Sequence, residues 1–550
     1  MARATTLVLL PAAIGAALWM LGPLPEAAPV HAGSSQVARQ LFDTAQVCIA
    51  CHSGLVTRSG EDVSFGPHWR ASMMANSARD PYWQAGVRRE TLDHPQVGAL
   101  IEDECSACHM PMARYQSKAA GHGGGVFANL PVGASRAPSA RLAADGVSCT
   151  ACHQITPQKL GDRASFTGGF HVDTEAPFGR RQVFGPFQID KGRAQRMQSS
   201  SGFVPTQGSH LGTSEMCATC HTLITQAFGP TGDVVGELAE QVPYLEWQHS
   251  QYGESVSCQS CHMPEVSEAT RISSESGQPR GNVSRHQFRG GNAFMMRVLN
   301  RHARSLGVEA FPQELDVAAE RTTSHLASDA ARISVTRAEV SGGRLLAEVT
   351  IESLAGHKLP TGYPSRRAWL HVTVRDRANA LVFESGRVDP TGRIDGNDND
   401  DDGARVEPHH AEITSQDQVQ IYESIMLDAE GRPTTGLLRG VRYAKDNRVL
   451  PKGFDKATAP GDIAVHGDAV SDADFTAGGD RVRYSVAVPG GKGPFSVEAE
   501  LLYQPVSYRW AESLGTYDAM ETTRFVQVYR SMASASVSTL ARVATLTRQP

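Results

Sequence analysis

The sequence CIACH at residues 48–52 recurs in four variants farther along the chain: CSACH at 105–109, CTACH at 149–153, CATCH at 217–221 and CQSCH at 258–262. Together the five copies contain all ten cysteines of the 550-residue chain. C-x-x-C-H is the signature of covalent attachment of a c-type haem. Residues i, i+3 and i+4 share one face of a helical turn, so one motif presents two thiols to a porphyrin and an imidazole to its iron. The repeats therefore predict five haems c.

Each motif supplies two attachment cysteines and one proximal iron ligand. The predicted attachment residues are Cys48, Cys51, Cys105, Cys108, Cys149, Cys152, Cys217, Cys220, Cys258 and Cys261. The predicted proximal ligands are His52, His109, His153, His221 and His262.

Zinc and disulfides are the competing explanations of paired cysteines. Zinc chemistry does not demand a histidine directly after every second cysteine. An exported chain with an even number of cysteines often carries disulfides, but here every pair would have to close the same two-residue loop. Thioredoxin-like redox pairs occur singly, beside a βαβ pattern. The haem explanation is therefore favoured.

The composition is that of an ordinary soluble protein, with 40% hydrophobic and 20% charged residues and a formal net charge of −6. This charge does not favour nucleic acid as a partner. The 52 glycines and 30 prolines predict long loops, which suits a chain that wraps around porphyrins. The length predicts several domains.

The N-terminus has the pattern of an export signal over residues 1–32. Arg3 precedes an apolar run at residues 7–21, and Val30-His31-Ala32 forms a small-x-small cleavage site. An uncleaved N-terminal anchor is the alternative, although a membrane span needs about 20 apolar residues. We expect an exported protein, periplasmic or extracellular, that is soluble or anchored at its N-terminus.

We predict an α + β multidomain chain. A loop-rich, helical pentahaem domain at 33–300 precedes a helical linker at 301–330, with helical patterns at 293–306 and 317–327. An all-β, sandwich-like (Ig-like) domain is expected at 331–505, and a C-terminal helical segment at 506–550. Alternating apolar residues predict three β-hairpins, formed by 333–340 with 344–351, by 369–374 with 381–384, and by 482–488 with 495–503.

The sixth ligand of each iron separates an electron carrier from a catalyst or gas binder. His286 in RHQFRGGN and His122 in GHGGG are candidates because their small neighbours allow close approach to a haem. His210 lies seven residues before Cys217, and His357 lies in GHKLPTG. All four are candidate distal ligands.

Other candidates have less context in their favour. Met74, with Met73 beside it, offers a thioether, which is the other usual axial ligand. The weaker histidine candidates are His68, His171 and His249. We expect Arg366 and Arg367, which follow His357, to pair with haem propionates.

The run DNDDDG at residues 398–403 resembles the first half of a calcium-binding loop. Asp398, Asp400 and Asp402 would supply oxygen ligands at alternating positions, and Gly403 the turn. The twelfth position is His409 rather than Glu, with Glu407 as a substitute. A calcium site and a solvated acidic loop both stay open.

Over residues 45–300 the chain resembles the exported multihaem cytochromes of the cytochrome c554 and c-prime family. The resemblance rests on the C-x-x-C-H set, two Cys-His-Met-Pro strings and the HQFRGGN segment. In this family a helix often carries Trp-x-x-Ser-x-His, whose histidine binds a haem. Here the last position is Met74 in one copy and Tyr252 in the other, which suggests methionine ligation or an open site. The β-rich extension resembles that of uncharacterised members.

The first hypothesis is a multihaem cytochrome that passes electrons among redox proteins, such as a quinol-oxidising complex, other cytochromes or a reductase. The second is an oxidoreductase acting on a small nitrogen or sulfur compound at one open haem. No motif has Lys in place of His, unlike the catalytic motif of pentahaem nitrite reductase. The third is a docking or electron-entry subunit of a larger redox complex.

Overall fold

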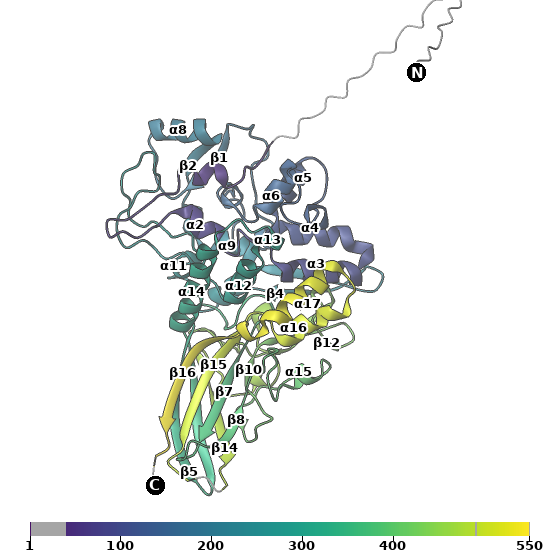
Figure 1. Ribbon diagram of the computed structural model, residues 1–550, viewed down its shortest axis with the longest axis vertical. Coiled ribbons are helices and arrows are strands. Elements are labelled where there is room, and N and C mark those ends of the chain that lie inside the picture. The colour runs from purple at the N-terminus through teal and green to yellow at the C-terminus, as the bar shows by residue number, and fades with distance from the viewer. Residues whose placement is uncertain (2–39, 490–491, 549–550) are drawn as a thin grey trace, which may run out of the picture. The chain divides into compact units, whose positions relative to one another are not determined.

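The five C-x-x-C-H motifs lie on or beside short helices, as their spacing predicts. The computed structural model describes Met1, residues 40–489 and residues 492–548 (Figure 1). The helices that carry or adjoin the motifs are α1 (Gln46–Ile49), α4 (Gly98–His109), α7 (Cys149–Cys152), α9 (Ser214–His221) and α11 (Cys258–His262). The signal or anchor predicted at residues 1–32 lies outside the described residues, apart from Met1.

Other short elements and long loops connect these helices. The helices are α2 (Phe65–Arg70), α3 (Pro81–Asp93), α5 (Pro111–Ala119), α6 (Pro138–Ala144), α8 (Lys191–Ser201) and α10 (Pro243–Gln248). Strands β1 (Arg181–Gly185) and β2 (Phe203–Gln207) pair in parallel, and β3 (Leu223–Phe228) and β4 (Val234–Gln241) pair antiparallel. The start of α3 follows from its sequence, because the Asp80 carboxylate accepts hydrogen bonds from two backbone N–H groups and Pro81 occupies the first helical position.

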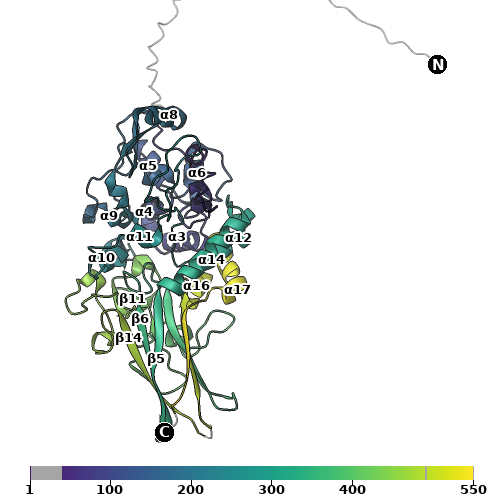
Figure 2. The ribbon, with the colours of Figure 1, turned by 90° about the vertical axis from the view of Figure 1, so that its left-hand side faces the viewer.

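The predicted helical transition is present as α12 (Ala293–Arg301), α13 (Ala303–Leu306) and α14 (Pro312–Asp329). At the start of α14 the Glu314 side chain accepts a hydrogen bond from the Phe311 backbone N–H, and Pro312 follows. These are ordinary start signals of a helix. Figure 2 shows α14 lying across the end of the long strands that follow it.

Two sheets form the part of the chain that follows α14. One has the order β5 (Ala331–Ser341), β6 (Arg344–Ser353), β14 (Gly479–Ala487) and β9 (Glu412–Ile413). The other has the order β10 (Ile421–Tyr422), β7 (Arg367–Arg375), β15 (Ser496–Gln504) and β16 (Ser538–Leu546), with β8 (Leu381–Ser385) beside β7. A small third sheet joins β12 (Pro433–Thr434), β11 (Ser424–Leu427) and β13 (Arg442–Asp446).

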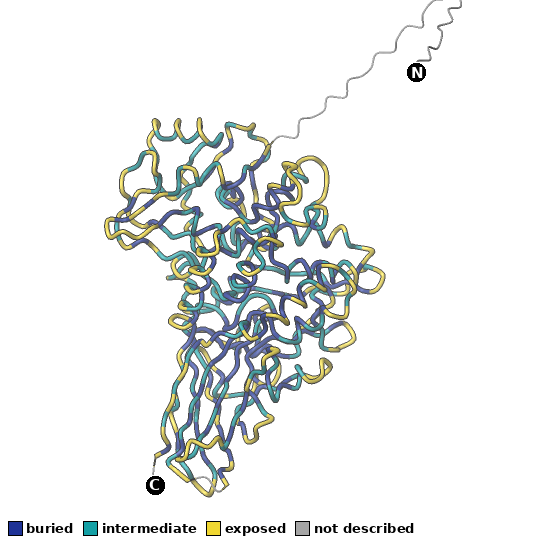
Figure 3. The backbone as a smooth tube through the Cα atoms, in the orientation of Figure 1, coloured by how far each residue is buried: buried dark blue, intermediate teal, exposed yellow. Residues whose placement is uncertain are grey.

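The two large sheets share one hydrophobic core. Alternate residues of β6, such as Val349, and of β7, such as Val372, belong to the same buried cluster as Leu501 of β15. This alternation is the signature of strands with one face in a core. Figure 3 shows the buried residues running along the strands, with exposed residues at the loops and strand tips. The arrangement agrees with a sandwich-like packing, and an Ig-like strand order stays a prediction.

Two of the three predicted hairpins are confirmed. Strand β5 pairs antiparallel with β6, and β7 pairs antiparallel with β8. The third prediction is wrong, because β14 pairs with β6 and β9 whereas β15 pairs with β7 and β16. Alternation identifies a strand and its buried face, but it does not select the partner strand.

The C-terminal segment is only partly helical. It contains α16 (Tyr508–Ser513) and α17 (Met520–Met532), and then β16, which contradicts the prediction of a helical segment to the end of the chain. Helix α17 packs on α3, and Arg88 of α3 makes a bidentate ion pair with Glu521 at 2.8 and 3.1 Å (Figure 1). The described residues from 40 onward form one compact unit, so the domain boundaries expected within them stay predictions. Of the helices that the structure describes, none is long and apolar enough to span a membrane.

The shared core gives a stability prediction. Leu501 is fully buried between the sheets, whereas Leu381 at the start of β8 is 46% exposed. Leu501→Ala should lower the free energy of unfolding by about 2–5 kcal/mol, because it leaves a cavity in the core. The matched control Leu381→Ala should change it by less than about 0.5 kcal/mol. Thermal unfolding followed by circular dichroism checks both, and equal effects would contradict the shared core.

Candidate functional site

A cavity of about 1660 Å³ lies among the motifs and receives residues from all five of them. The motif residues in its wall are Cys48, Ile49, Cys51, His52, Cys105, Cys108, His109, Cys149, Thr150, Ala151, Cys152, His153, Cys217, Thr219, Cys220, His221, Gln259 and Ser260. All ten cysteines are free thiols, and no disulfide joins them. Four of the five predicted proximal imidazoles thus face one shared space.

Thiols of different motifs contact one another. The thiol of Cys48 lies beside that of Cys149, Cys108 lies beside Cys220, and Cys217 lies beside Cys258. The first motif therefore lies beside the third, and the fourth lies beside both the second and the fifth. Cys220 also acts electrostatically on Cys152, so the third motif lies near the fourth. The fourth motif is the centre of this arrangement.

Four of the five proximal histidines use Nδ1 in the same way. The Nδ1–H group donates to the carbonyl of Ile272 from His52 (2.5 Å), Ser77 from His109 (3.1 Å), Phe184 from His153 (2.6 Å) and Arg289 from His262 (2.5 Å). A proton on Nδ1 leaves the lone pair on Nε2. This second hydrogen bond is the usual way in which a protein orients a metal-binding histidine.

Burial keeps these imidazoles neutral. It lowers the pKa of His52, His153 and His221 below the ordinary value, and the pKa of His109 and of His262 to about 4. His221 is classed as exposed because part of its surface faces the cavity that it lines. A metal-binding histidine must be neutral. The donor set, two thiols and a neutral imidazole with a free Nε2, therefore fits a c-type haem.

Two predicted distal histidines lie opposite proximal histidines. The ring centres are 6.2 Å apart for His153 and His286, with planes at 10°, and 6.3 Å apart for His262 and His357, with planes at 16°. With a metal–nitrogen distance of 2.0–2.1 Å, as at zinc, two imidazoles on opposite sides of one iron have ring centres about 6 Å apart. The Nδ1–H groups of His286 and His357 donate to the carbonyls of Ser284 and Lys358, which leaves both Nε2 atoms free.

The sequence did not single out His325 of α14, whose ring centre lies 6.1 Å from that of His262. Its Nδ1 is 2.8 Å from the Asp329 carboxylate, a pair four residues apart on the exposed side of the helix. His325 has no glycine-rich surroundings, and the criterion of small neighbours therefore misses it. His357 and His325 are therefore competing candidates for the distal position opposite His262.

The other distal candidates are less well placed. His122 is exposed, and His210 binds the Ile155 carbonyl through Nε2 at 2.8 Å, so its Nε2 is not free. Met74 and Met73 both line the cavity. Of the weaker candidates, His68 is buried with no hydrogen-bond partner at Nδ1, whereas His171 and His249 hydrogen-bond to Thr156 and to the Asp455 carbonyl.

Arg366 and Arg367, which were both predicted to pair with haem propionates, lie in different surroundings. Arg366 lines the cavity and acts electrostatically on His221. Arg367 is buried elsewhere and donates to Gln504, Asp400 and the Gly392 carbonyl, so the prediction for Arg367 is wrong. Arg367 is the first residue of β7, whereas Arg366 precedes the strand.

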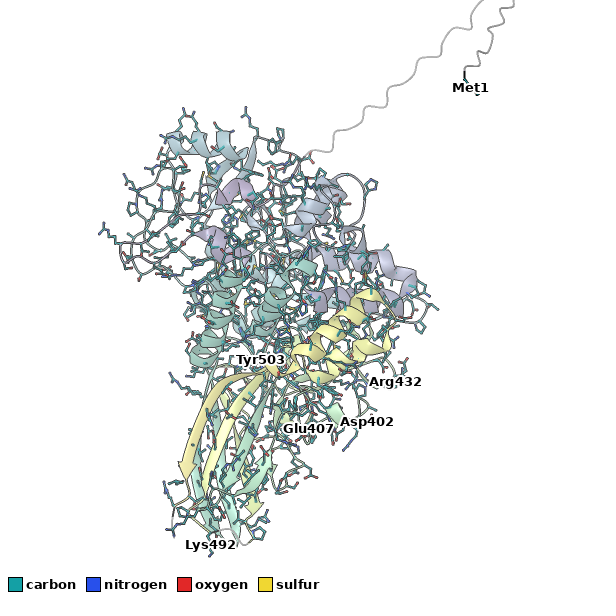
Figure 4. The ribbon with its side chains drawn as sticks, in the orientation of Figure 1. Met1, Asp402, Glu407, Arg432, Lys492 and Tyr503 are labelled. Carbon is teal, nitrogen blue, oxygen red and sulfur yellow. The ribbon has the colours of Figure 1, made fainter. Side chains whose placement is uncertain are left out.

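The acidic loop at 398–403 contains the short helix α15 (Asp398–Asp401). Its carboxylates are engaged separately: Asp400 with Arg367 and the Ile394 N–H, Asp398 with Arg405, and Asp402 with the Ala404 N–H. Figure 4 shows Asp402 and Glu407 at the flank of the sheets, whereas Lys492 and Tyr503 mark opposite ends of the long strands. In the described part of the chain these carboxylates form no group that could hold an ion, so the calcium prediction gains no support.

Among the described residues, His409, Asp472 and Asp480 form a group of potential metal ligands. The side-chain amides of Gln420 and Asn447 lie 2.8 and 3.0 Å from His409 Nδ1. Backbone partners fix the orientation of both amides, so both donate to Nδ1. Nε2 then carries the proton and donates it to Asp472 at 3.1 Å, so the group is a closed hydrogen-bond network.

Buried acids in the cavity wall were not predicted from the sequence. Glu240 of β4 is buried in the wall beside Glu90 of α3. Burial, reinforced by the Glu90 charge, raises the pKa of Glu240 to about 8. Tyr363 lines the same wall, and its ring centre lies 5.7 Å from that of Tyr82. Nothing in the sequence of β4 distinguishes Glu240 from a solvated strand residue.

Comparison with known proteins gives one distant structural likeness. No protein-family model matches the chain, and no curated protein matches it. A solved structure described as a penta-heme cytochrome c552 from Thermochromatium tepidum is 15% identical, with a TM-score of 0.49. The match covers 92% of this chain and 100% of that chain. A likeness at this level carries no argument about the function of this chain.

The pKa of Glu240 gives a prediction for the pH dependence of stability. Because the folded protein binds this proton more tightly than the unfolded chain, stability should fall as pH rises from about 4.5 to about 8, by at most about 1.4 kcal/mol per pH unit. Glu240→Gln should remove this contribution. The exposed control Glu237→Gln, on the same strand, should keep it. Melting temperatures measured from pH 5 to 8 decide, and parallel curves for wild type and Glu240→Gln would contradict it.

Proposed function

We propose that the protein is a multihaem c-type cytochrome that carries electrons through five covalently bound haems. The observation that carries the proposal is the common cavity, where four proximal imidazoles are neutral and three of these four direct Nδ1 to a backbone carbonyl. His262, beside the cavity, has the same arrangement. A bound haem accepts and releases one electron at its iron. The chain's own part is to attach, orient and shield these groups.

The contacts between motifs support a continuous path for electrons. The order is first, third, fourth and fifth motif, with the second as a branch at the fourth. Electrostatic effects between the proximal histidines agree with this order of motifs. His221 contributes to lowering the pKa of His109 and of His262, and His52 contributes to lowering that of His153. An electron entering at either end would pass the fourth motif.

His286 and His357 are proposed as the distal ligands of the third and fifth haems. Two imidazoles on one iron give a six-coordinate, electron-transfer haem. We keep the other proposed distal ligands, His122, His210 and Met74, below these two, because His122 is exposed and the Nε2 of His210 is engaged.

An oxidoreductase acting on a small nitrogen or sulfur compound is the second candidate function. Among the described residues, no second imidazole lies opposite His52, His109 or His221 at the spacing of the two pairs. The cavity wall is also polar, because Arg366 acts electrostatically on His221 and because Tyr363 and Glu240 line the same cavity. These groups could orient a small anion and supply a proton.

The surroundings of the protein are also proposals. The N-terminal pattern supports export to the periplasm or cell exterior, where a quinol-oxidising complex, another cytochrome or a reductase would be the redox partner. A docking or electron-entry role for the two-sheet part remains the third candidate.

The haem content tests the proposal first. Pyridine haemochrome absorbance divided by protein concentration should give five haems per chain. Replacing Cys149 and Cys152 with Ala should give four, because a haem held by no thioether is lost on denaturation. A ratio near four or six for the wild type would contradict the assignment of one haem to each motif.

The spin state of the irons tests the distal ligands. His286→Ala and His357→Ala should each convert one low-spin haem to high spin in the EPR spectrum of the oxidised protein, because each removes one of two axial ligands. His122→Ala is the matched control and should leave the spectrum unchanged. His325→Ala separates the rivals at the fifth haem. A high-spin signal with His325→Ala, and none with His357→Ala, would contradict the assignment of His357.

Turnover separates the carrier from the enzyme. A carrier should take up electrons from dithionite without tight binding of cyanide or nitric oxide. Turnover of nitrite, hydroxylamine or tetrathionate with a redox mediator would favour the second candidate function.

A further inference from the structure

Four charged side chains, here called the charge cluster, are buried together where α10 meets the two-sheet part. They are Glu246, Lys358, Asp446 and Arg448, and their side chains are at most 8% exposed. Glu246 precedes the fifth motif in sequence, whereas the other three belong to the part beyond α14. Two acids and two bases balance in charge, as buried charges require.

Asp446 is the centre of the cluster. Its carboxylate accepts a bidentate pair of hydrogen bonds from Arg448, at 2.8 and 2.7 Å, and one from Lys358 Nζ at 2.7 Å. Burial alone would raise the pKa of Asp446, but Arg448 and Lys358 outweigh burial and hold that pKa below its usual range. Asp446 therefore stays ionised, and it holds Arg448 beside Glu246.

Glu246 connects the cluster to the segment that carries His357. Its Oε2 accepts hydrogen bonds from the Lys358 backbone N–H at 3.1 Å and from the Thr361 hydroxyl at 2.5 Å. The Lys358 N–H belongs to the peptide group that joins His357 to Lys358, so Glu246 holds this peptide directly. Oε1 lies 2.9 Å from Arg448 Nη1, without the alignment of a hydrogen bond.

Two further contacts fix the same segment. Leu359 and Val449 exchange both backbone hydrogen bonds at 2.9 Å, which ties the His357 segment to the segment that carries Asp446 and Arg448. On the other side, Gly356 lies close to Trp247 and Tyr252, where a Cβ atom would be 3.5–3.6 Å from both side chains. The backbone on either side of His357 is thus held by α10 and by the cluster.

We propose that Glu246 is a positioning residue for His357, and that the charge cluster sets the imidazole of His357 at its 6.3 Å spacing from His262. The inference rests on the proposed role of His357 as a haem ligand. The proposed role of the charge cluster is to define geometry, since buried ion pairs contribute little net stability but define geometry when fully paired. Outer groups of this kind commonly orient metal ligands.

The experiment compares spin states in the full-length, haem-loaded protein. His357→Ala should lose the low-spin signal of one haem completely, and added imidazole should restore it. Glu246→Ala should lose the same signal in part, because His357 is retained but its backbone is released. Glu246→Gln should also lose it in part, since an amide cannot offer oxygen to Lys358 and Thr361 without turning its NH₂ group toward Arg448. The exposed control Glu254→Gln should match the wild type.

The outcomes separate the two proposals. If His357→Ala leaves the spectrum unchanged, the ligand role itself is wrong. If His357→Ala changes the spectrum, but folded Glu246→Ala and Glu246→Gln with five haems keep the wild-type spectrum, the positioning role is wrong. Should Glu246→Ala fail to fold, Glu246→Gln decides alone. A partial high-spin signal at the fifth haem, reversed by added imidazole, supports the inference.

Discussion

The hydrogen bond from Nδ1 of a motif histidine to a backbone carbonyl is the constraint on which the rest of the structure depends. It fixes the orientation of the imidazole and leaves Nε2 free for the iron of the proposed haem. Three of the carbonyls, those of Ser77, Ile272 and Arg289, come from loops, and that of Phe184 comes from strand β1. Ser77, Phe184 and Arg289 lie 27–32 residues from the histidines that they hold, and Ile272 lies 220 residues from His52. The long connections between short helices are therefore functional, because they deliver these carbonyls to the cavity.

The two-sheet part is joined to the motif-bearing part by a shared hydrophobic cluster, which includes Ala85 and Phe525, and by polar contacts. Glu246 meets Lys358 and Arg448 on one side, and Arg88 meets Glu521 on the other. Breaking one partner of a buried pair costs about 3–5 kcal/mol, whereas the intact pair contributes little. Such contacts define a geometry more than they stabilise it, which suits a part that carries the proposed distal ligand of the fifth haem.

The sequence predicts what is local. Motif spacing places the thiols and imidazoles, caps such as Asp80 start helices, and alternation identifies β5, β6, β7 and β8 with their hairpin partners. The sequence does not predict which distant strands pair, because β14 and β15 have the expected alternation but join different sheets. His357 was a candidate because of its glycine neighbour, whereas His325 and Glu240 carry no local signal, since their surroundings come from remote segments. The acidic loop shows the reverse case, where a suggestive pattern is used for arginine pairing and backbone hydrogen bonds.

The central claim is that the paired imidazoles enclose iron. X-ray diffraction from crystals of the haem-loaded protein at the iron absorption edge tests it most directly. The account predicts five iron positions per chain, one at each motif, with one iron between His153 and His286 and one between His262 and His357. The iron of the fourth motif should have those of the second, third and fifth motifs as its neighbours. Fewer than five iron positions, or irons lying away from both histidine pairs, would contradict the account.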